Sequence, residues 1–347
     1  MNRKTLVEQL TKASIGLSPT GELQQSDCFV FRNHNVHTFN DEILVSVLCD
    51  LEIIGAVPAK ALLELLKKLS DDDLIFETDD KSLRIKGKGK RASVVLQSEI
   101  VLPIDMVEKP KDMEWFTLPE KFFEAVQFVG SCTRRDAEYA ILACVHVTPD
   151  WVEASNGYQA ARYKLKQTGL TESILIPWKS LGKIVSSFPT NELVEFAVTD
   201  EWVHFRDTHG TIISCVQELK RFLDLSQPLN WSGTPITLPS DVSKMVSTAS
   251  VFASMGDSDI PFIRVRLREG GIEVKGENEF GSFAERKKAD YKGEDISFNV
   301  APKLLNEIAK KSAKCEITKG KLKAQTKEWV YVACTWVESR NEIHSDD

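Results

Sequence analysis

One pattern of apolar and polar positions occurs three times along the chain. The stretches VPAKALLELLKK, IPWKSLGKIVSS and VAPKLLNEIAKK begin at residues 57, 176 and 300. Aligned without gaps, Leu62 matches Leu181 and Leu305, and apolar residues follow three and four positions later, which is one stripe of a helix. Each stretch has a proline at or near the first helical turn, where a missing N–H costs nothing. The pattern predicts three equivalent amphipathic helices.

A second helical pattern accompanies each of these three stretches. FTLPEKFFEAVQFVGS starts at residue 116, ITLPSDVSKMVSTASVFAS starts at residue 236, and NRKTLVEQLTKASIGL near the first residue is their counterpart. The apolar positions that match are Phe122, Val126 and Val129, then Val242, Val246 and Ala249, with Leu6, Leu10 and Ala13 in the first copy. Short alternating runs broken by polar turns follow the helices, and they predict antiparallel strands.

The repeat governs the domain organisation that we expect. Polar segments that contain proline, EKPKDMEW at 108–115 and SQPLNWSGTP at 226–235, separate the copies. We therefore predict an α+β protein of three tandem similar domains at residues 1–112, 113–230 and 231–338. The last residues, 339–347, are polar and without periodicity, which predicts a flexible acidic tail.

Composition narrows the class of protein. The sequence has 347 residues, a formal net charge of −7 and no apolar run of the roughly 18–20 residues that a membrane span requires. Its seven cysteines are scattered without a C-x-x-C pair, so buried free thiols and a cytoplasmic location are expected. We expect no membrane association and no cofactor.

Cations gather on the faces opposite the apolar stripes. Lysine occupies the same position in all three copies of the first helix type. Exposure to solvent would explain a lysine in any single helix, but it does not require a lysine at the same position in all three. If the helices line the inside of an arc, their cations suit the phosphate backbone of duplex DNA, held without sequence readout. The predicted DNA-binding residues are Arg3, Lys4, Lys12, Lys60, Lys67, Lys68, Lys121, Arg134, Arg135, Lys179, Lys183, Lys244, Lys303, Lys310 and Lys311.

These repeats resemble a known family. Three tandem copies with FTLP-like openings and [IV]P-x-K helices resemble the bacterial-type DNA sliding clamp, the beta subunit of replicative DNA polymerase III. EASNGYQAARYKL at 153–165 resembles the family's Ala-Thr-Asp-Gly-His-Arg-Leu-Ala stretch, and KRFLDLSQPL at 220–229 resembles its Arg-Phe-Pro-Asp-Tyr link. The resemblance covers essentially the whole chain and implies the DNA-clamp fold, with two helices per domain on the inner face and sheets outside.

The resemblance also implies partners. A head-to-tail homodimer would form a ring around duplex DNA, act as a processivity factor, and dock DNA polymerase and clamp loader through a peptide groove. Carried over position by position, the groove residues are Ile141, Ser155, Gly157, Tyr158, Gln159, Ala160, Leu223, Pro228, Val332, Cys334 and Trp336. Ile141, Val332 and Cys334 would equally suit ordinary core strands, whereas Trp336 near the chain end requires a surface to cover.

The sequence departs from the family at several places. It enters the first helix almost directly instead of through a strand, and YVACTWV runs on into an acidic tail instead of a Met-Pro-Met-Arg-Leu-like close. Asn156, Tyr158 and Gln159 stand where the family has Asp, His and Arg. The divergence suggests a clamp encoded by a phage or mobile element, and a changed docking motif.

Two other functions stay open. A monomeric, non-catalytic processivity or inhibitory scaffold that mimics a clamp would carry the same repeats. An enzyme would need a site, and G-x-S-x-G, H-E-x-x-H and the nucleotide-binding fingerprints are absent from the sequence, which leaves only an uncharacterised nuclease. The acids of SDDDLIFETDD at 70–80 and the histidines of NHNVH at 33–37 fit solvated turns and strand edges better than a metal site.

Overall fold

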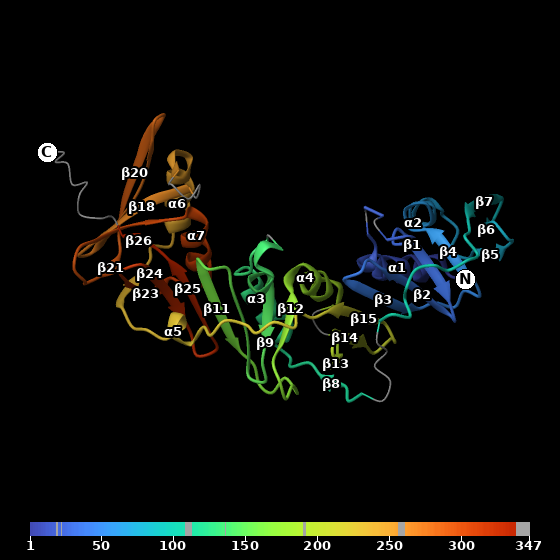
Figure 1. The fold of residues 1–347 in the computed structure, drawn as a ribbon. Coiled ribbons are helices and arrows are strands. Elements are labelled where there is room, and N and C mark those ends of the chain that lie inside the picture. Colours follow the sequence, from blue (N-terminus) through green and yellow to red (C-terminus); the bar gives the residue numbers. More distant parts are fainter. Residues whose placement is uncertain are drawn as a thin grey trace. The chain divides into compact units, whose positions relative to one another are not determined.

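The computed structural model describes residues 1–18, 20–21, 23–107, 113–135, 137–189, 192–255 and 261–337 in two compact units (Figure 1). The first unit comprises Met1–Gln127, Arg135–Asp150 and Leu165–Arg221. The second comprises Phe128–Arg134, Trp151–Lys164 and the described residues from Phe222 onward. Residues 108–112 of the predicted linker and the predicted tail at 339–347 lie outside the described residues, so the division into three domains stays a prediction.

The helices of the described residues form where the apolar periodicity predicts them, except for one short helix inside the segment 226–235 that was predicted as a linker. They are α1 (Arg3–Ala13), α2 (Ala59–Lys68), α3 (Phe122–Gly130), α4 (Trp178–Ser187), α5 (Ser226–Leu229), α6 (Val242–Ala249) and α7 (Pro302–Lys311), with short 3₁₀ turns η1 (Ser14–Gly16), η2 (Ala137–Ala143) and η3 (Ser250–Phe252). Helix α1 has one fully buried face, formed by Leu6, Leu10 and Ala13. The carboxamide oxygen of Asn2 accepts hydrogen bonds from the backbone N–H of Lys4 (3.0 Å) and caps this helix, so the chain does enter α1 almost directly.

The three helices predicted as equivalent, α2, α4 and α7, are each ten residues long. Pro58 and Pro177 are the N-caps of α2 and α4, and Pro302 is the first residue of α7. The aligned residues Leu62, Leu181 and Leu305 are all buried. A short strand leads into each helix: β4 (Gly55–Pro58), β12 (Ile174–Pro177) and β22 (Ile296–Val300). The repeat therefore exists as structure as well as sequence.

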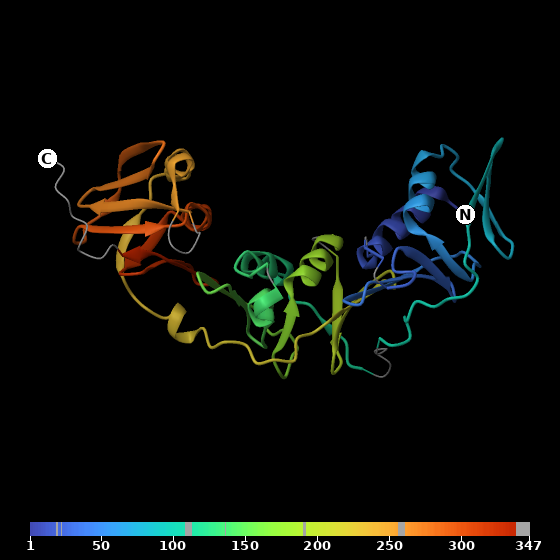
Figure 2. The same ribbon diagram turned by 45° about the horizontal axis from the view of Figure 1, so that its top comes forward.

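The first unit is built on one eight-stranded antiparallel sheet. Its order is β4-β1-β2-β3-β15-β14-β13-β8, from β1 (Cys28–Arg32), β2 (Asn35–Phe39), β3 (Ile43–Leu48), β15 (Ile212–Val216), β14 (Trp202–Asp207), β13 (Val194–Val198) and β8 (Phe116–Thr117). The ladder of β3 with β15 pairs Val45 with Ile213 and joins segments that are far apart in the sequence. Helices α1 and α2 lie side by side against this sheet (Figures 1 and 2).

Two smaller groups of strands complete the first unit. A three-stranded sheet has the order β5-β6-β7, from β5 (Ile75–Thr78), β6 (Ser82–Gly87) and β7 (Lys90–Val95). Strand β9 (Cys144–Val147) pairs with β12. In the β5–β7 sheet, Leu83 and Ile85 are buried while Arg84 between them is exposed, which is the alternation of a sheet with one covered face.

The second unit contains two sheets. One has the order β10-β11-β25-β24-β23-β16-β21, from β10 (Trp151–Ser155), β11 (Gln159–Lys164), β25 (Trp329–Cys334), β24 (Lys321–Gln325), β23 (Lys314–Thr318), β16 (Thr234–Thr237) and β21 (Asp290–Tyr291). The other has the order β20-β19-β18-β22-β26, from β20 (Gly281–Lys288), β19 (Gly271–Asn278), β18 (Pro261–Arg268) and β26 (Trp336–Val337), and β17 (Ser254–Met255) pairs with β18. The ladder of β11 with β25 pairs Tyr163 with Trp329.

All seven cysteines are free thiols, and six of them are buried, as predicted. Burial raises the pKa of Cys28 and Cys132 to about 12, so these thiols are poor nucleophiles at neutral pH. Among the described residues, no helix is long and apolar enough to cross a membrane.

Candidate functional site

Most of the predicted DNA-binding cations project into solvent. The exposed ones are Lys4, Lys60, Lys67, Lys68, Lys121, Arg135, Lys179, Lys183, Lys244, Lys303 and Lys310. Arg3, Lys12, Arg134 and Lys311 are half-buried instead. The helix faces that the sequence assigned to solvent are therefore largely exposed, and whether they contact DNA stays a prediction.

Several exposed lysines already have carboxylate partners, among them Lys4, whose ammonium lies 3.6 Å from the Asp72 carboxylate. Lys179 forms an ion pair with Glu42 at 2.9 Å, and Lys310 forms one with Glu307 at 3.2 Å. The ammonium groups of these lysines are largely solvated, so a phosphate can compete for each of them at little cost. Arg3 differs, because its guanidinium donates to the carbonyl oxygens of Asp71 (2.9 Å) and Leu66 (3.2 Å) and holds the start of α1 against the end of α2.

Lys12 is used inside the first unit. Its ammonium forms a short ion pair with the fully buried carboxylate of Asp207 and lies 5.7 Å from the centre of the Phe188 ring. Burial by itself would raise the pKa of Asp207, but hydrogen bonds from Lys12 and Thr211 outweigh it and leave the pKa below its usual value. Lys12 therefore joins α1 to the end of β14, and it was not recognisable from sequence as a member of an ion pair.

Lys311 is used inside the second unit. Its ammonium lies 3.9 Å from the centre of the Phe128 ring and 5.1 Å from that of Tyr331. Burial lowers the pKa of Lys311. Phe128 also contacts Tyr163 edge-on and Trp329, at ring separations of 5.6 and 4.9 Å, so the lysine covers an aromatic cluster.

Three of the predicted groove residues line one pocket of the second unit. A pocket of about 440 Å³ is lined by Tyr158, Gln159 and Trp336 from the predicted set. Lys303 and Leu304 of α7, Ser250 and Ala253 near η3, and Asn156 complete much of its wall. Apolar surface dominates the lining, and Lys303 and Asn156 supply polar groups, which is the composition of a ligand site.

The turn between β10 and β11 shapes this pocket. Gly157 has a φ of +90°, a conformation that a side chain would strain. The carboxamide oxygen of Asn156 accepts the backbone N–H groups of Tyr158 and Gln159, both at 3.0 Å. Cys334 donates its backbone N–H to the Tyr158 carbonyl at 2.8 Å. The turn therefore presents the half-exposed Tyr158 ring next to Trp336, with ring centres 6.3 Å apart.

The other predicted groove residues have different surroundings. Gln159 is buried, donates to the Ser131 carbonyl at 2.7 Å and accepts a short hydrogen bond from the Tyr331 hydroxyl, so its side chain is committed to the fold. Ala160 and Val332 are buried partners in the β11–β25 ladder, and Ser155 is buried beneath the turn. None of these three residues lines the pocket beside Trp336.

Three more predicted residues lie elsewhere. Leu223 is 49 % exposed and Pro228 is in α5, and neither lines the pocket beside Trp336. A second pocket, of about 390 Å³, borders α5 and is lined by Leu229 and Trp329 among others. Ile141 belongs to the first unit. The set carried over from the family is therefore distributed over several surroundings, and its use as one groove stays a prediction.

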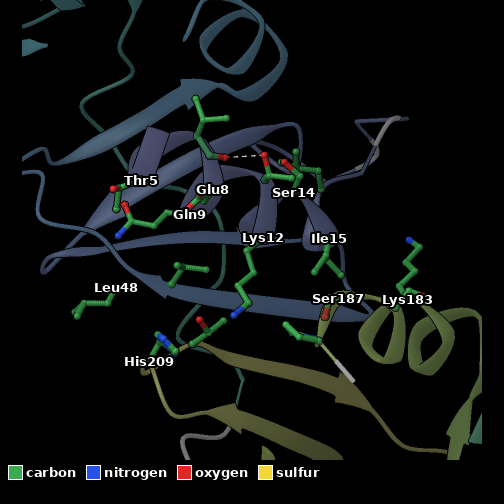
Figure 3. A pocket seen from close by; sticks show the side chains of 17 residues that line it. Thr5, Glu8, Gln9, Lys12, Ser14, Ile15, Leu48, Lys183, Ser187 and His209 are labelled. Carbon is green, nitrogen blue, oxygen red and sulfur yellow. Dashed lines mark hydrogen bonds between the residues drawn. The ribbon is translucent and has the colours of Figure 1, made fainter. Parts of the chain in front are cut away.

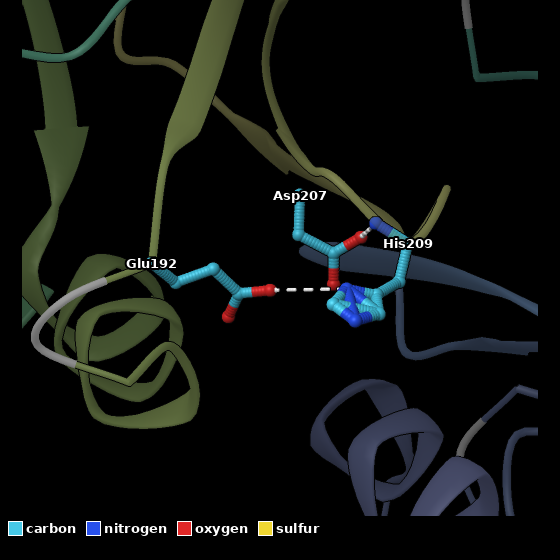
Figure 4. Close-up of side chains that lie close together, drawn as sticks. All are labelled: Glu192, Asp207 and His209. Atoms are coloured by element: carbon cyan, nitrogen blue, oxygen red, sulfur yellow. Dashed lines mark hydrogen bonds and ion pairs between the residues drawn. The ribbon is translucent and has the colours of Figure 1, made fainter.

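Three potential metal ligands meet in the first unit, and no ligand spacing in the sequence indicated them. Side-chain atoms of Glu192, Asp207 and His209 lie within 4.8 Å of one another (Figure 4). Glu192 faces the His209 ring at 3.6 Å, and the Asp207 carboxylate also accepts the backbone N–H of His209 at 2.9 Å. The ammonium of Lys12 already occupies Asp207. A metal ion would have to displace this cation, so the arrangement suits an ion-pair network better than a metal centre.

Comparison with known proteins gives a result at the level of the fold. No protein-family model matches the sequence, and no curated protein does. Solved structures match over nearly the full length. The DNA polymerase sliding clamp from Bacillus subtilis has a TM-score of 0.84 at 15 % identity, with 98 % of each chain covered. The DNA polymerase III subunit beta from Pseudomonas aeruginosa has a TM-score of 0.83 at 14 % identity, with 97 % of this chain and 99 % of that chain covered.

A third solved structure agrees with these two. The DNA polymerase III beta chain from Streptococcus pneumoniae has a TM-score of 0.84 at 14 % identity and covers 97 % of this chain. The α+β architecture and its resemblance to sliding clamps, both predicted from the repeats, are thus confirmed. This chain has the fold of the bacterial DNA polymerase III beta sliding clamps.

Proposed function

We propose that the protein is a ring-shaped DNA sliding clamp, a non-catalytic processivity factor that encircles duplex DNA. The observation that carries the proposal is the match to proteins named as sliding clamps over essentially the whole chain. The exposed lysines of α2, α4, α6 and α7 supply the positive charge for sequence-independent contacts with phosphate. The pocket beside Trp336 is the proposed docking site for a segment of DNA polymerase or clamp loader.

The sheet edges support a head-to-tail ring. Twice within the chain, the last strand of one meander pairs with the last strand of another far along the sequence, β3 with β15 and β11 with β25. By the same internal pattern, β20 and β7 are a third such pair, and each stands at the end of its sheet. We infer that β20 of one chain pairs with β7 of a second chain. Because this contact is heterologous, two copies of it can close a ring of two chains.

Side chains at one end of these two strands suit that pairing. In an antiparallel ladder the end of β7 lies beside the beginning of β20. Val95 at the end of β7 is 62 % exposed, and Phe280 directly before β20 is 83 % exposed. Large apolar side chains with this exposure are what an uncovered interface would present.

The opposite end of the two strands favours the monomeric scaffold as a second candidate. There, Lys90 and Arg91 of β7 would approach Arg286 and Lys288 of β20, and like charges across strands are unfavourable. Lys90 has an ion pair with Asp71 at 2.9 Å, which offsets part of this repulsion. The balance between the apolar end and the basic end decides between ring and monomer.

Complementation between two variants tests the ring. V95D and F280D each place a charge at every β7–β20 contact, so each variant alone should sediment as a monomer. In an equal mixture, one chain keeps an intact β7 and the other an intact β20, so an open dimer should form through that one contact. Leu219→Asp, at a residue that is 69 % exposed outside both strands, is the control and should still give the closed dimer. A parent protein that sediments as a monomer would select the scaffold.

Retention on DNA tests the clamp itself. Loaded protein should stay on circular DNA at high salt and leave after the circle is cut, because topology rather than affinity holds it. Lys60, Lys67 and Lys244 are exposed and form no ion pair among the described residues, so K60E/K67E/K244E should fold normally and load poorly. The matched control is K292E/K319E/K327E, which reverses three exposed lysines in the connections between strands. Equal loading by both triple variants would refute the role of the helix faces.

A further inference from the structure

The first unit contains a large pocket that the proposed clamp activity does not use. It has a volume of about 950 Å³ and lies between α1, the end of α4 and the turn after β14 (Figure 3). Val47, Leu48 and Ile15 give it an apolar floor, and Leu48 is 50 % exposed at its rim. Figure 3 shows Lys12 reaching from α1 across the pocket towards His209.

The internal repeat explains why this pocket exists. A spacing of 116 residues relates Leu6 to Phe122 in the helices and the first residue of β3 to that of β11. The same spacing makes Lys12 the counterpart of Phe128 and Val47 the counterpart of Tyr163.

The partner strands extend the comparison. Trp329 stands opposite Tyr163 in the β11–β25 ladder. Thr211 comes next to Ile212, which stands opposite Ser46 in the β3–β15 ladder, and this places Thr211 at the Trp329 position. The alignment of α4 with α7 that matches Leu181 with Leu305 also matches Ser187 with Lys311.

The two sets of counterparts differ in size. In the second unit, the Phe128 ring packs on Tyr163 and on Trp329, with ring centres 5.6 and 4.9 Å apart, between helix α3 and the sheet. In the first unit, the counterparts Lys12, Val47, Thr211 and Ser187 all line the pocket. An aromatic side chain buries roughly 150–250 Å², so replacing three of them by smaller or extended side chains leaves room for at least one ring from outside.

Charge at the rim indicates what accompanies that ring. Lys183 of α4 lines the pocket, is exposed, and has no ion pair among the described residues. His209 is 76 % exposed on another side. Lys12 is neutralised by Asp207, and the exposed Glu8 of α1 lines another part of the pocket, so an acidic group is favoured on the side of Lys183.

We propose that this pocket docks a partner protein through a tryptophan or phenylalanine side chain with an acidic residue beside it. The aromatic side chain of the partner takes the position that corresponds to Phe128 and Trp329 in the second unit. The acidic side chain beside it forms an ion pair with Lys183. This partner surface is separate from the pocket beside Trp336, and it does not depend on ring formation.

The test uses the full-length protein with ¹³C-labelled isoleucine, leucine and valine methyl groups. The probes are acetyl-Asp-Trp-Asp-amide and, as the counterpart without an aromatic ring, acetyl-Asp-Ala-Asp-amide. The tryptophan peptide should shift the methyl signals of Ile15, Val47 and Leu48 and leave those of Leu304, in the other pocket, unchanged. The alanine peptide should shift none of them.

Three variants locate the interaction. T211W puts the second unit's own side chain into the pocket, and S186W places a ring at its mouth from an exposed position of α4, so each should weaken peptide binding at least tenfold. S247W, at an exposed serine of α6, is the matched control and should bind like the parent. K183E should weaken binding of the acidic peptide severalfold but leave binding of neutral N-acetyltryptophanamide unchanged. Absence of the methyl shifts, or parent-like binding by S186W, overturns the proposal.

Discussion

Strands far apart in the sequence pair at two junctions, β3 with β15 and β11 with β25. Both junctions are antiparallel ladders, but the side chains packed on them differ: charged at the first and aromatic at the second. At the β3–β15 junction, Lys12 lies near Phe188 and forms an ion pair with buried Asp207. At the β11–β25 junction, Lys311 covers Phe128 and Tyr331. One junction is held by a carboxylate in a half-open pocket, and the other by packed rings.

This difference shows how one backbone arrangement tolerates different interiors. The sheet supplies the backbone hydrogen bonds at both junctions, so the side chains packed on it need only exclude water or neutralise one another's charge. Aromatic rings exclude water, largely independently of pH and salt. An ion pair neutralises charge, and its contribution to stability depends on protonation. The two junctions should therefore respond differently to the same perturbations.

The largest expected effect comes from removing the central ring of the aromatic junction. Phe128→Ala abolishes contacts with Tyr163, Trp329 and Lys311 and should lower the free energy of unfolding by about 3 kcal/mol. Chemical denaturation measures this loss. Leu219→Ala, at an exposed side chain outside the proposed interface, is the control and should change stability by less than about 0.5 kcal/mol. Equal effects of the two substitutions would show that the cluster is not a packed core.

Breaking the ion pair from one side should cost somewhat less. Lys12→Met leaves the Asp207 carboxylate buried with its backbone donors only, and should lower the free energy of unfolding by about 2 kcal/mol. The double variant K12M/D207N restores a neutral pair. It should recover part of the loss, and a double-mutant cycle gives the coupling energy. Strictly additive losses would mean that the two side chains do not interact in solution.

The pH dependence should separate the junctions at acid pH. Because the folded pKa of Asp207 lies below the unfolded value of about 3.9, its contribution is present above that value and is lost as pH falls through the folded pKa. D207N should flatten the decline of stability below about pH 4. Thermal unfolding between pH 3 and 6 measures it. A decline as steep as in the parent would assign the acid sensitivity to other carboxylates.

At alkaline pH, the aromatic junction of β11 with β25 should become more stable as pH rises. Lys311 has a lowered folded pKa, so the unfolded chain binds more protons and stability should rise with pH as Lys311 loses its proton in the folded state. Lys311→Met should abolish this rise while leaving the acid side unchanged. Denaturation between pH 8 and 10.5 checks it, and a rise that persists in the variant would contradict the assignment.

The smallest effect is expected for the surface pair beside the first junction. Lys179 and Glu42 are 71 % and 41 % exposed, so Lys179→Ala should change stability by less than about 0.5 kcal/mol, and high salt should remove even that. The comparison would need revision if this variant lost as much stability as Lys12→Met.

The residues with helical periodicity were predictable in detail. Leu62, Leu181 and Leu305 are aligned in sequence and buried in the structure, and α1 begins at Arg3 as the sequence indicated. Apolar spacing is a local property that each helix carries by itself, which is why the repeat led to the fold. The candidate groove was only partly predictable, because Tyr158 and Trp336 line one pocket while Leu223 and Pro228 do not.

What the sequence alone determined is the threefold repeat, the amphipathic helices and the exposed cations, because each depends on residues close together in the chain. The tertiary structure decided which lysines are free. Lys12 pairs with Asp207, 195 positions away, and Lys311 packs on Phe128, 183 positions away. The same holds for the pocket above Val47 and Thr211, which belong to segments that β3 and β15 bring together. Such groups meet only when distant strands pair, and no periodicity along the chain records that meeting.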